Sequence, residues 1–249
     1  MAALTLQCVV LAGGLGTRMR PVSQAIPKAL IPVLGRPFAD WQLEHLAAQG
    51  VQRVTFCVGH FGERLRAHVG DGSHFGLKVM WVDDGERLRG TGGALRVALD
   101  LGALEDAFFV LYGDSYLPVP MSDVEAAWRK SKQPALMTVL RNQGRWDASN
   151  AIYWDGRVIR YDKTRPNQMQ TQMLWIDYGL SVLTREVIAT RIEPGSVADL
   201  AQVMKDLSIE GRLAGLEVGE RFYEAGSPEG LRDLEVYLAD ETRSRGEPG

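Results

Sequence analysis

The sequence predicts an α/β fold: a doubly wound, mostly parallel, Rossmann-like sheet with a small β-hairpin subregion. Through the first half, short apolar runs of β-prone residues alternate with segments of helical periodicity. That order is typical of parallel strands joined by right-handed helical crossovers. In the second half, Asp155-Gly156 separates two alternating runs, which indicates a hairpin. A chain of 249 residues, 45% of them hydrophobic, suits one such domain with a sizeable core.

The first half of the chain alternates strands and helices. Apolar strand-like runs occupy 5–12, 51–60, 77–84 and 106–114, and helical periodicity occupies 37–50, 62–70 and 91–102. Gly50 provides a helix stop, because glycine readily takes the left-handed conformation that ends a helix. Ligands of open parallel sheets bind beyond the carboxyl ends of the strands. Asp114, at the end of the last run, is therefore expected beside a ligand.

The second half begins with the predicted hairpin at 151–163 and changes character. A strand is expected at 173–184, two helices at 184–192 and 197–211, and β structure again within 213–226. Ser227 is a suitable N-cap for a last amphipathic helix. We expect a single domain over 1–240, with a nucleotide-binding half at 1–120 and a second half at 121–240, followed by a flexible polar tail at 241–249.

Composition excludes several classes of protein. A net charge of −3 and a pI near 5.9 favour neither nucleic acid nor an anionic membrane as a partner. Cys8 and Cys57 lie in apolar runs and are expected to be core residues rather than a disulfide or metal site. No apolar run has the length of a membrane span, and the N-terminus has no basic flank of a signal peptide. We therefore expect a cytoplasmic location.

The most informative segment is 11–30, LAGGLGTRMRPVSQAIPKAL. An apolar run ends there in closely spaced glycines, followed by two cations, Arg18 and Lys28. Glycines let backbone N–H groups converge on an anion, and the cations add charge, so the segment is typical of a polyphosphate-binding loop. Met19 stands where a dinucleotide fingerprint needs its third glycine, and the chain contains no Gly-Lys pair for a Walker A loop. A tight turn with a solvated Arg18 remains the structural alternative.

These residues carry a family resemblance. LAGGLGTRMRPVS…PKALIPV resembles the G-G-x-G-T-R-x-x-P…P-K motif of the sugar-1-phosphate nucleotidylyltransferases. The likeness runs from about Leu6 to about Leu238 and is greatest for short bacterial guanylyltransferases of heptose or mannose 1-phosphate and for N-acetylmuramate 1-phosphate uridylyltransferases. It implies the nucleotidyltransferase type of fold without the left-handed β-helix domain that some relatives append, since no hexapeptide repeat is present.

The resemblance also implies a reaction. An NTP and a sugar 1-phosphate would give an NDP-sugar and pyrophosphate, with Mg²⁺ as cofactor and a place in cell-surface polysaccharide biosynthesis. GTP with a heptose or mannose 1-phosphate is the first expectation. Uridylyl or thymidylyl transfer to another sugar 1-phosphate and a catalytically silent regulatory homologue are the alternatives. An NAD-dependent oxidoreductase would need an acidic ribose anchor about twenty residues after the glycines, where this chain has Lys28 and apolar residues. Monomer and homodimer both stay open.

The resemblance assigns roles to individual residues. Asp114 would bind Mg²⁺ with Glu224, which stands where relatives have Asp in a pattern like Asp-x-Gly-x-Pro-Glu. Arg18, Lys28 and Lys163 would be catalytic, Lys163 by holding the sugar phosphate with Asp162 orienting it. The nucleotide would meet Leu11, Ala12, Gly13, Gly14, Gly16, Thr17, Arg18, Thr91, Gly92 and Gly113. The sugar phosphate would meet Asn150, Lys163, Asp177 and Gly179.

Overall fold

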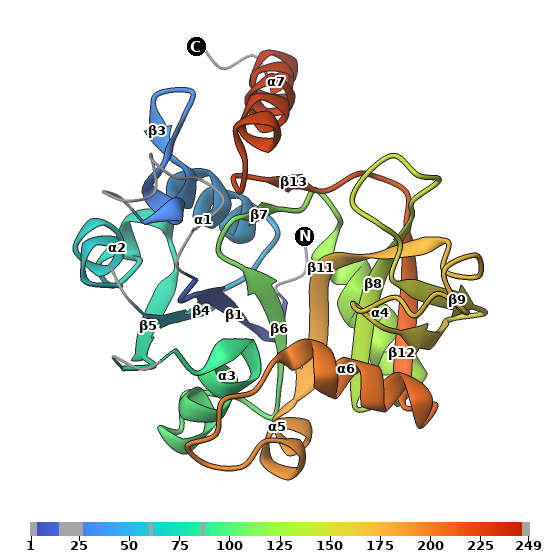
Figure 1. Cartoon of the computed structure of the whole chain (residues 1–249). Helices are drawn as coiled ribbons and strands as arrows, with labels where there is room; N and C mark the ends of the chain where they lie inside the picture. The colour runs from blue at the N-terminus through green and yellow to red at the C-terminus, as the bar shows by residue number, and fades with distance from the viewer. Residues whose placement is uncertain (1–3, 15–26, 60–61, 86–87, 246–249) are drawn as a thin grey trace.

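A computed structural model describes residues 4–14, 27–59, 62–85 and 88–245 of the chain (Figure 1). Within these ranges, nine strands form one twisted sheet. In sheet order they are β5 (Lys78–Asp83), β4 (Arg53–Val58), β1 (Gln7–Ala12), β6 (Ala107–Tyr112), β11 (Trp175–Thr184), β8 (Ala135–Arg141), β12 (Leu213–Val218), β10 (Arg157–Tyr161) and β9 (Ala151–Trp154).

The first four strands of that order are parallel, as the alternation of strands and helices predicts. Beyond them the sheet is mixed, because β11 runs antiparallel to both of its neighbours, β6 and β8. β12 is parallel to β8, while β10 and β9 form the expected hairpin. Asp155 and Gly156 at its tip have φ of 45° and 75°, the left-handed pair that a two-residue turn between twisted strands requires.

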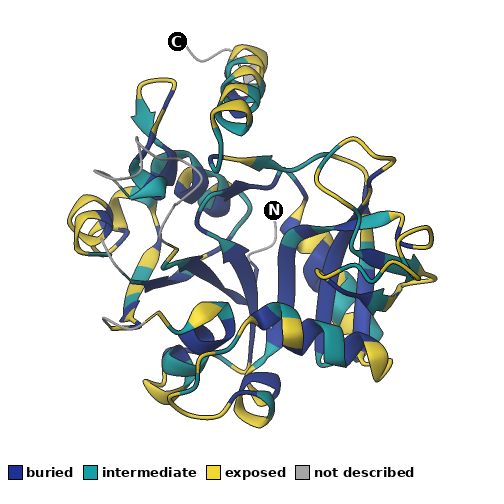
Figure 2. Cartoon of the chain, viewed as in Figure 1, coloured by how far each residue is buried: buried dark blue, intermediate teal, exposed yellow. Residues whose placement is uncertain are grey.

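Helices cover both faces of the sheet, so the fold is doubly wound. On one face lie α1 (Phe38–Ala48), α2 (Gly62–Val69) and α4 (Met121–Ser131), and on the other lie α3 (Gly90–Asp100), α5 (Arg185–Arg191) and α6 (Leu200–Ile209). Successive side chains of a strand point to opposite faces. Cys8 and Val10 therefore join the first core, and Val9 and Leu11 join the second (Figure 2).

Both cysteines are core residues, as expected. Cys8 and Cys57 are buried free thiols that belong to the cores on opposite faces of the sheet. Burial raises the pKa of each thiol to about 12, so neither is a thiolate at neutral pH. Across the described parts of the chain, no helix combines the length and apolar character needed to cross a lipid bilayer.

In a third, smaller core, the C-terminal helix α7 (Pro228–Arg245) packs against two short two-stranded ribbons. One ribbon pairs β2 (Pro32–Val33) with β3 (Arg36–Pro37), and the other pairs β7 (Ser115–Tyr116) with β13 (Tyr223–Glu224). Leu234 and Leu238 pack with Tyr116 and Phe38. The helix continues to Arg245, so it includes the first part of the segment expected to be a tail. The Thr242 hydroxyl there donates to the Leu238 carbonyl, as helical threonines do.

Candidate active site

The carboxyl ends of β1, β4 and β5 meet around the side chain of Asp84. A Cβ atom on Gly13 would lie 3.2 Å from one carboxylate oxygen of Asp84, and a Cβ on Gly59 would lie 2.9 Å from the other. Glycine is thus required at both positions because a protein carboxylate sits between them. Among the described residues nothing lies within 4 Å of a Cβ built on Gly14.

The residues expected to bind the nucleotide separate into four groups, of which Thr91 and Gly92 on α3 are the last. Gly16, Thr17 and Arg18 lie outside the described residues. Leu11 is a core residue whose carbonyl accepts a hydrogen bond from the Gly113 N–H at 2.9 Å. A Cβ on Gly113 would lie 2.9 Å from that of Ala12, so this glycine allows the ends of β6 and β1 to approach closely. Gly13 and Gly14 remain as the described beginning of the loop.

Thr91 and Gly92 have a different surrounding from the one expected. The Thr91 hydroxyl donates to Asp199 and accepts from the Leu200 N–H, both at 2.9 Å, and the Gly92 N–H donates to the Ala198 carbonyl. The first turn of α3 is therefore bonded to the segment that enters α6, and that Thr91 and Gly92 bind a nucleotide stays a prediction. A Cβ on Gly90 would lie 2.5 Å from the Ala198 oxygen, which explains the glycines of this run.

Asp84 is a residue that sequence reasoning missed. It follows β5 directly and is buried, with one carboxylate oxygen lacking a hydrogen-bond partner among the described residues. Burial, followed by the neighbouring charge of Asp83, raises the pKa of Asp84 to about 6. The sequence feature that could have identified Asp84 is the pair of acidic residues, Asp83 and Asp84, at the carboxyl end of a predicted parallel strand. Such unsatisfied buried groups gather at functional sites.

Lys28 and Asp114 form an ion pair at this edge of the sheet. Lys28 begins a short 3-10 turn (Lys28–Leu30), and its Nζ lies 2.8 Å from the Asp114 carboxylate, at the end of β6. The β7–β13 ribbon sets Glu224 opposite Ser115, the residue after Asp114. Gly226 completes the cluster, since a Cβ there would lie 3.5 Å from Asp114 and 3.8 Å from Lys28 Nζ. Asp114 and Glu224, 110 positions apart, are thus brought together by one strand pair, β7–β13.

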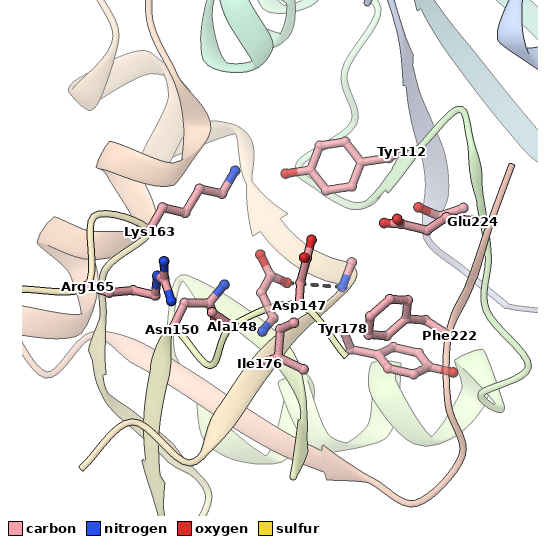
Figure 3. A pocket seen from close by; sticks show the side chains of 13 residues that line it. Tyr112, Asp147, Ala148, Asn150, Lys163, Arg165, Ile176, Tyr178, Phe222 and Glu224 are labelled. Atoms are coloured by element: carbon pink, nitrogen blue, oxygen red, sulfur yellow. Dashed lines mark hydrogen bonds between the residues drawn. The ribbon is translucent and has the colours of Figure 1, made fainter. Parts of the chain in front are cut away.

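A cavity of about 500 Å³ opens beside this cluster (Figure 3). Glu224 lines it together with the four residues expected to bind the sugar phosphate, Asn150, Lys163, Asp177 and Gly179. Its walls also include Tyr112, Asp147, Arg165, Tyr178 and Phe222, which sequence reasoning did not select. The structure therefore brings the predicted acceptor residues and one predicted metal ligand to a single space.

Asp177 is held firmly within this cavity. Its two carboxylate oxygens accept hydrogen bonds from the Gly179 N–H at 3.0 Å and from the Tyr161 hydroxyl at 3.1 Å. The Asn150 side-chain oxygen accepts from the Asp177 N–H at 2.9 Å, which leaves the Asn150 amide group to donate. Burial raises the pKa of Asp177, while the Gly179 bond and the charge of Lys163 act against that rise. Gly179 has φ of 101°, which only glycine adopts readily.

The turn that carries Lys163 is anchored by Asp162. Asp162 is buried and accepts from the Thr164 N–H and hydroxyl at 3.0 and 2.7 Å, and its other oxygen lies 2.9 Å from Lys205 Nζ. Burial opposes its ionisation, but Lys205 and Thr164 outweigh that effect and hold the pKa of Asp162 at about 2. The carboxylate of Asp162 is thus bonded to Thr164 and Lys205 and holds the turn that carries Lys163; that it orients Lys163 toward a sugar phosphate stays a prediction.

The chain is similar in sequence to a family of nucleotidyltransferases and to several of its characterised members. The family model described as the MobA-like NTP transferase domain matches residues 8–217. The D-glycero-alpha-D-manno-heptose 1-phosphate guanylyltransferase of Campylobacter jejuni is 31% identical over 184 residues, 73% of this chain and 77% of that protein. The N-acetylmuramate alpha-1-phosphate uridylyltransferase of Caulobacter vibrioides is 27% identical over 241 residues, 93% of this chain and 96% of that protein.

Other relatives are longer. A glucose-1-phosphate thymidylyltransferase of Streptomyces griseus is 34% identical over 137 residues, and the chain spans only 38% of its length. Among solved structures, HddC from Yersinia pseudotuberculosis in complex with GMP-PN has a TM-score of 0.72 at 23% identity, over 94% of this chain and 99% of that one. A UDP-glucose pyrophosphorylase from Acinetobacter baumannii has a TM-score of 0.73 at 16% identity, over 94% and 93%. These structures share the fold described above.

Proposed function

Because the chain belongs to the MobA-like NTP transferase domain family, we propose that it is a sugar-1-phosphate nucleotidylyltransferase. It would join the nucleoside monophosphate of an NTP to a sugar 1-phosphate and release pyrophosphate. The observation that carries this proposal is the meeting of two charged clusters at one cavity. Glu224, next to the Lys28–Asp114 pair, and Lys163, from the hairpin, line the same space. Heptose, muramate and glucose 1-phosphate nucleotidylyltransferases among the relatives support it.

Direct displacement at the α-phosphorus accounts for the residues available. An oxygen of the acceptor phosphate forms a bond to the α-phosphorus, and the bond to the departing pyrophosphate breaks, with no covalent enzyme intermediate. A sugar phosphate has a second pKa near ~6 and is already anionic at neutral pH, so the step needs no general base. The work of the protein is therefore to orient both phosphates and offset their charge. Lys163 would hold the acceptor, and Lys28 with Arg18 would hold the triphosphate.

The residues around Asp114 fit Mg²⁺. Asp114, the residue before β7, and Glu224, in β13, supply carboxylate oxygens, which is the donor chemistry that this cation prefers. The Lys28 ammonium, 2.8 Å from Asp114, is a cation already held at that carboxylate. Bound there, Mg²⁺ would neutralise charge on the phosphate oxygens. Glu in place of the usual Asp extends the reach by one methylene and retains the ligand type.

We further propose guanine as the base, with Asp84 as the group that selects it. Ionised aspartate only accepts hydrogen bonds, and guanine is the base whose pairing edge presents two adjacent donors, N1–H and N2–H₂. The unpartnered oxygen of Asp84 lies on the side of Gly59, and its other oxygen lies on the side of Gly13, where the loop begins at the carboxyl edge of the sheet. Uracil and thymine present carbonyl oxygens on both sides of their single N–H, and a carboxylate would repel these.

For the acceptor, a heptose or mannose 1-phosphate is the first candidate, supported by the guanylyltransferase relatives. The free Asn150 amide would donate to a sugar hydroxyl, and Asp177 would accept from another. The product, a GDP-sugar, would serve as a glycosyl donor in building polysaccharide.

A substrate panel tests the proposal. The purified chain is incubated with Mg²⁺, each of GTP, UTP, dTTP, ATP and CTP, and a set of sugar 1-phosphates, and pyrophosphate release is measured. Among neutral acceptors, we expect GTP with mannose or heptose 1-phosphate to give the highest kcat/KM. Preference for UTP or dTTP would overturn the guanine assignment alone. No release from any pair would favour a silent homologue and overturn the activity.

A further inference from the structure

The turn after the hairpin aims two cations into the acceptor cavity, and the sugar phosphate reaction explains only one of them. Thr164 turns back to Asp162, while Lys163 and Arg165, one on either side of it, both line the cavity. The Arg165 N–H donates to the Asp162 carbonyl at 3.2 Å, and its carbonyl accepts from Gln170 at 3.0 Å. The same buried, paired Asp162 thereby fixes both positions.

Arg165 has an unusual backbone. Its φ of 49° is in the left-handed region, which a residue with a Cβ seldom adopts. Such a conformation persists when surrounding bonds hold it, and it gathers at functional sites. The side chain that it carries is a long cationic one that lines the cavity beside Asn150 (Figure 3).

The Arg165 guanidinium is also without an anion. Among the described residues, it takes part in no ion pair and donates no hydrogen bond, although the side chain is half-buried. Asp177 also lines the cavity, but among the described residues no ion pair or hydrogen bond joins it to Arg165; its oxygens accept from Gly179 and Tyr161. Five donors on a planar group are therefore turned into a cavity with no carboxylate bonded to them.

The two cations face different parts of the cavity. In Figure 3, Lys163 extends toward the side on which Tyr112 lies, while Arg165 lies beside Asn150, on the side opposite Glu224. Glu224 marks the reacting end, where the acceptor phosphate must meet the nucleotide. An acceptor whose phosphate lay toward Glu224 would therefore place the part of its sugar farthest from the anomeric carbon near Arg165.

We propose that the preferred acceptor carries a second anionic group, a carboxylate or a phosphate remote from the anomeric carbon, and that Arg165 binds it. This rests on the proposed function and narrows its substrate class: the sugar 1-phosphate is an acidic one. Arginine matches the geometry of either oxyanion with two parallel N–H···O bonds. A neutral sugar would leave that half-buried guanidinium with water alone.

The test compares matched acceptors with three proteins. Mannose 1-phosphate, mannuronate 1-phosphate and mannose 1,6-bisphosphate are assayed with the wild type, Arg165→Gln and Arg165→Lys, using the NTP that the panel selects. We expect the wild type to favour one of the two anionic acceptors by about 10- to 100-fold in kcat/KM, the scale of one charge-assisted bond pair. Preference for mannuronate 1-phosphate would identify the second anion as a carboxylate, and preference for mannose 1,6-bisphosphate would identify it as a phosphate.

The variants distinguish the second anion from the first. Arg165→Gln should reduce the preference to about one while leaving KM for mannose 1-phosphate unchanged, and Arg165→Lys should retain part of it. Lys163→Gln is the matched control and should raise KM for all three acceptors. An equal rise for neutral and acidic acceptors in Arg165→Gln would mean that Arg165 shares the anomeric phosphate, which overturns the proposal. Equal use of all acceptors by the wild type also overturns it.

A failure of the proposed function would be visible separately. If no NTP gives pyrophosphate, acceptor binding is measured by calorimetry with the wild type and Arg165→Gln. Tighter binding of an acidic sugar phosphate that is lost in the variant supports the role of Arg165 without any catalysis. Equal binding of neutral and acidic sugar phosphates rejects it. Unfolding temperatures of the variants, expected within about 2 °C of wild type, show that the fold is intact.

Discussion

Replacing Asp84 by asparagine should stabilise the protein and weaken its use of GTP at the same time. The carboxylate is buried with one oxygen unpartnered, and its pKa rises from 3.8 to about 6. That rise corresponds to about 3 kcal/mol against the ionised form in the folded state. Solvent in the open loop screens part of this, so we expect a gain of about 1 to 2 kcal/mol for the amide at pH 8.

The pH dependence gives the sign of the effect. Because the folded-state pKa is raised, the folded protein holds the proton more tightly than the unfolded chain, and the penalty exists where Asp84 is ionised, above about 6. As the pH falls through 6 toward 3.8, wild type regains this stability and the advantage of the variant shrinks. Urea denaturation at pH 8, 6 and 4 measures the free energy of unfolding of both proteins.

Asp83→Asn is the matched control. Asp83 is exposed and accepts the Gly85 N–H at 2.8 Å, so its loss should change stability by only a few tenths of a kcal/mol. For Asp84→Asn we expect kcat/KM with GTP to fall about 10- to 100-fold, and that with UTP to fall little or not at all. An Asp84→Asn variant less stable than wild type at pH 8 would refute the inference that the ionised Asp84 carboxylate destabilises the folded protein. A stabilised variant with unchanged GTP kinetics would refute its role in base selection.

Three further substitutions address the remaining parts of the site. Asp114→Asn should lower kcat by at least ~100-fold, the cost of one lost electrostatic group; near-normal turnover would remove Asp114 from the metal site. Asp162→Asn loses the ion pair with Lys205 and should lower the free energy of unfolding by about 1 to 3 kcal/mol at pH 7. Since the pKa of Asp162 is held at about 2, this difference should fade as the pH drops below 4; a difference constant down to pH 2 would contradict it. Gly179→Ala, at φ of 101°, should cost about 1 to 3 kcal/mol and raise the acceptor KM, because the N–H that fixes Asp177 moves; unchanged stability and KM would contradict the constraint.

The parts of the fold that depend on local hydrophobic periodicity and turn residues could be predicted from the sequence. Alternating apolar runs and helical periods predict the parallel strands β1, β4, β5 and β6, and Asp155-Gly156 predicts the β9–β10 hairpin. The position of β11 between β6 and β8 could not be predicted from the sequence, because strand order is set by contacts between residues distant in the chain.

In the candidate site, too, some residues could be predicted from the sequence and others could not. Asn150, Lys163, Asp177 and Gly179 were selected from the family resemblance, and they line one cavity. The packing of the glycines at 90–93 against Ala198 could not be predicted because Ala198 is about a hundred residues away, and their contact with a nucleotide stays a prediction.

Asp84 and Arg165 were missed for a related reason. Each is ordinary in the sequence, and each becomes notable only when burial and the lack of a partner are seen in three dimensions.

The central claim is that an oxygen of the acceptor phosphate attacks the α-phosphorus of the NTP. Mannose 1-phosphate, or the acceptor that the panel prefers, is prepared with ¹⁸O in the phosphate and allowed to react with GTP and Mg²⁺, and the products are analysed by ³¹P NMR and mass spectrometry. The account predicts that all of the ¹⁸O stays in the NDP-sugar and that the pyrophosphate is unlabelled. Labelled pyrophosphate, or release of inorganic phosphate in its place, would contradict it.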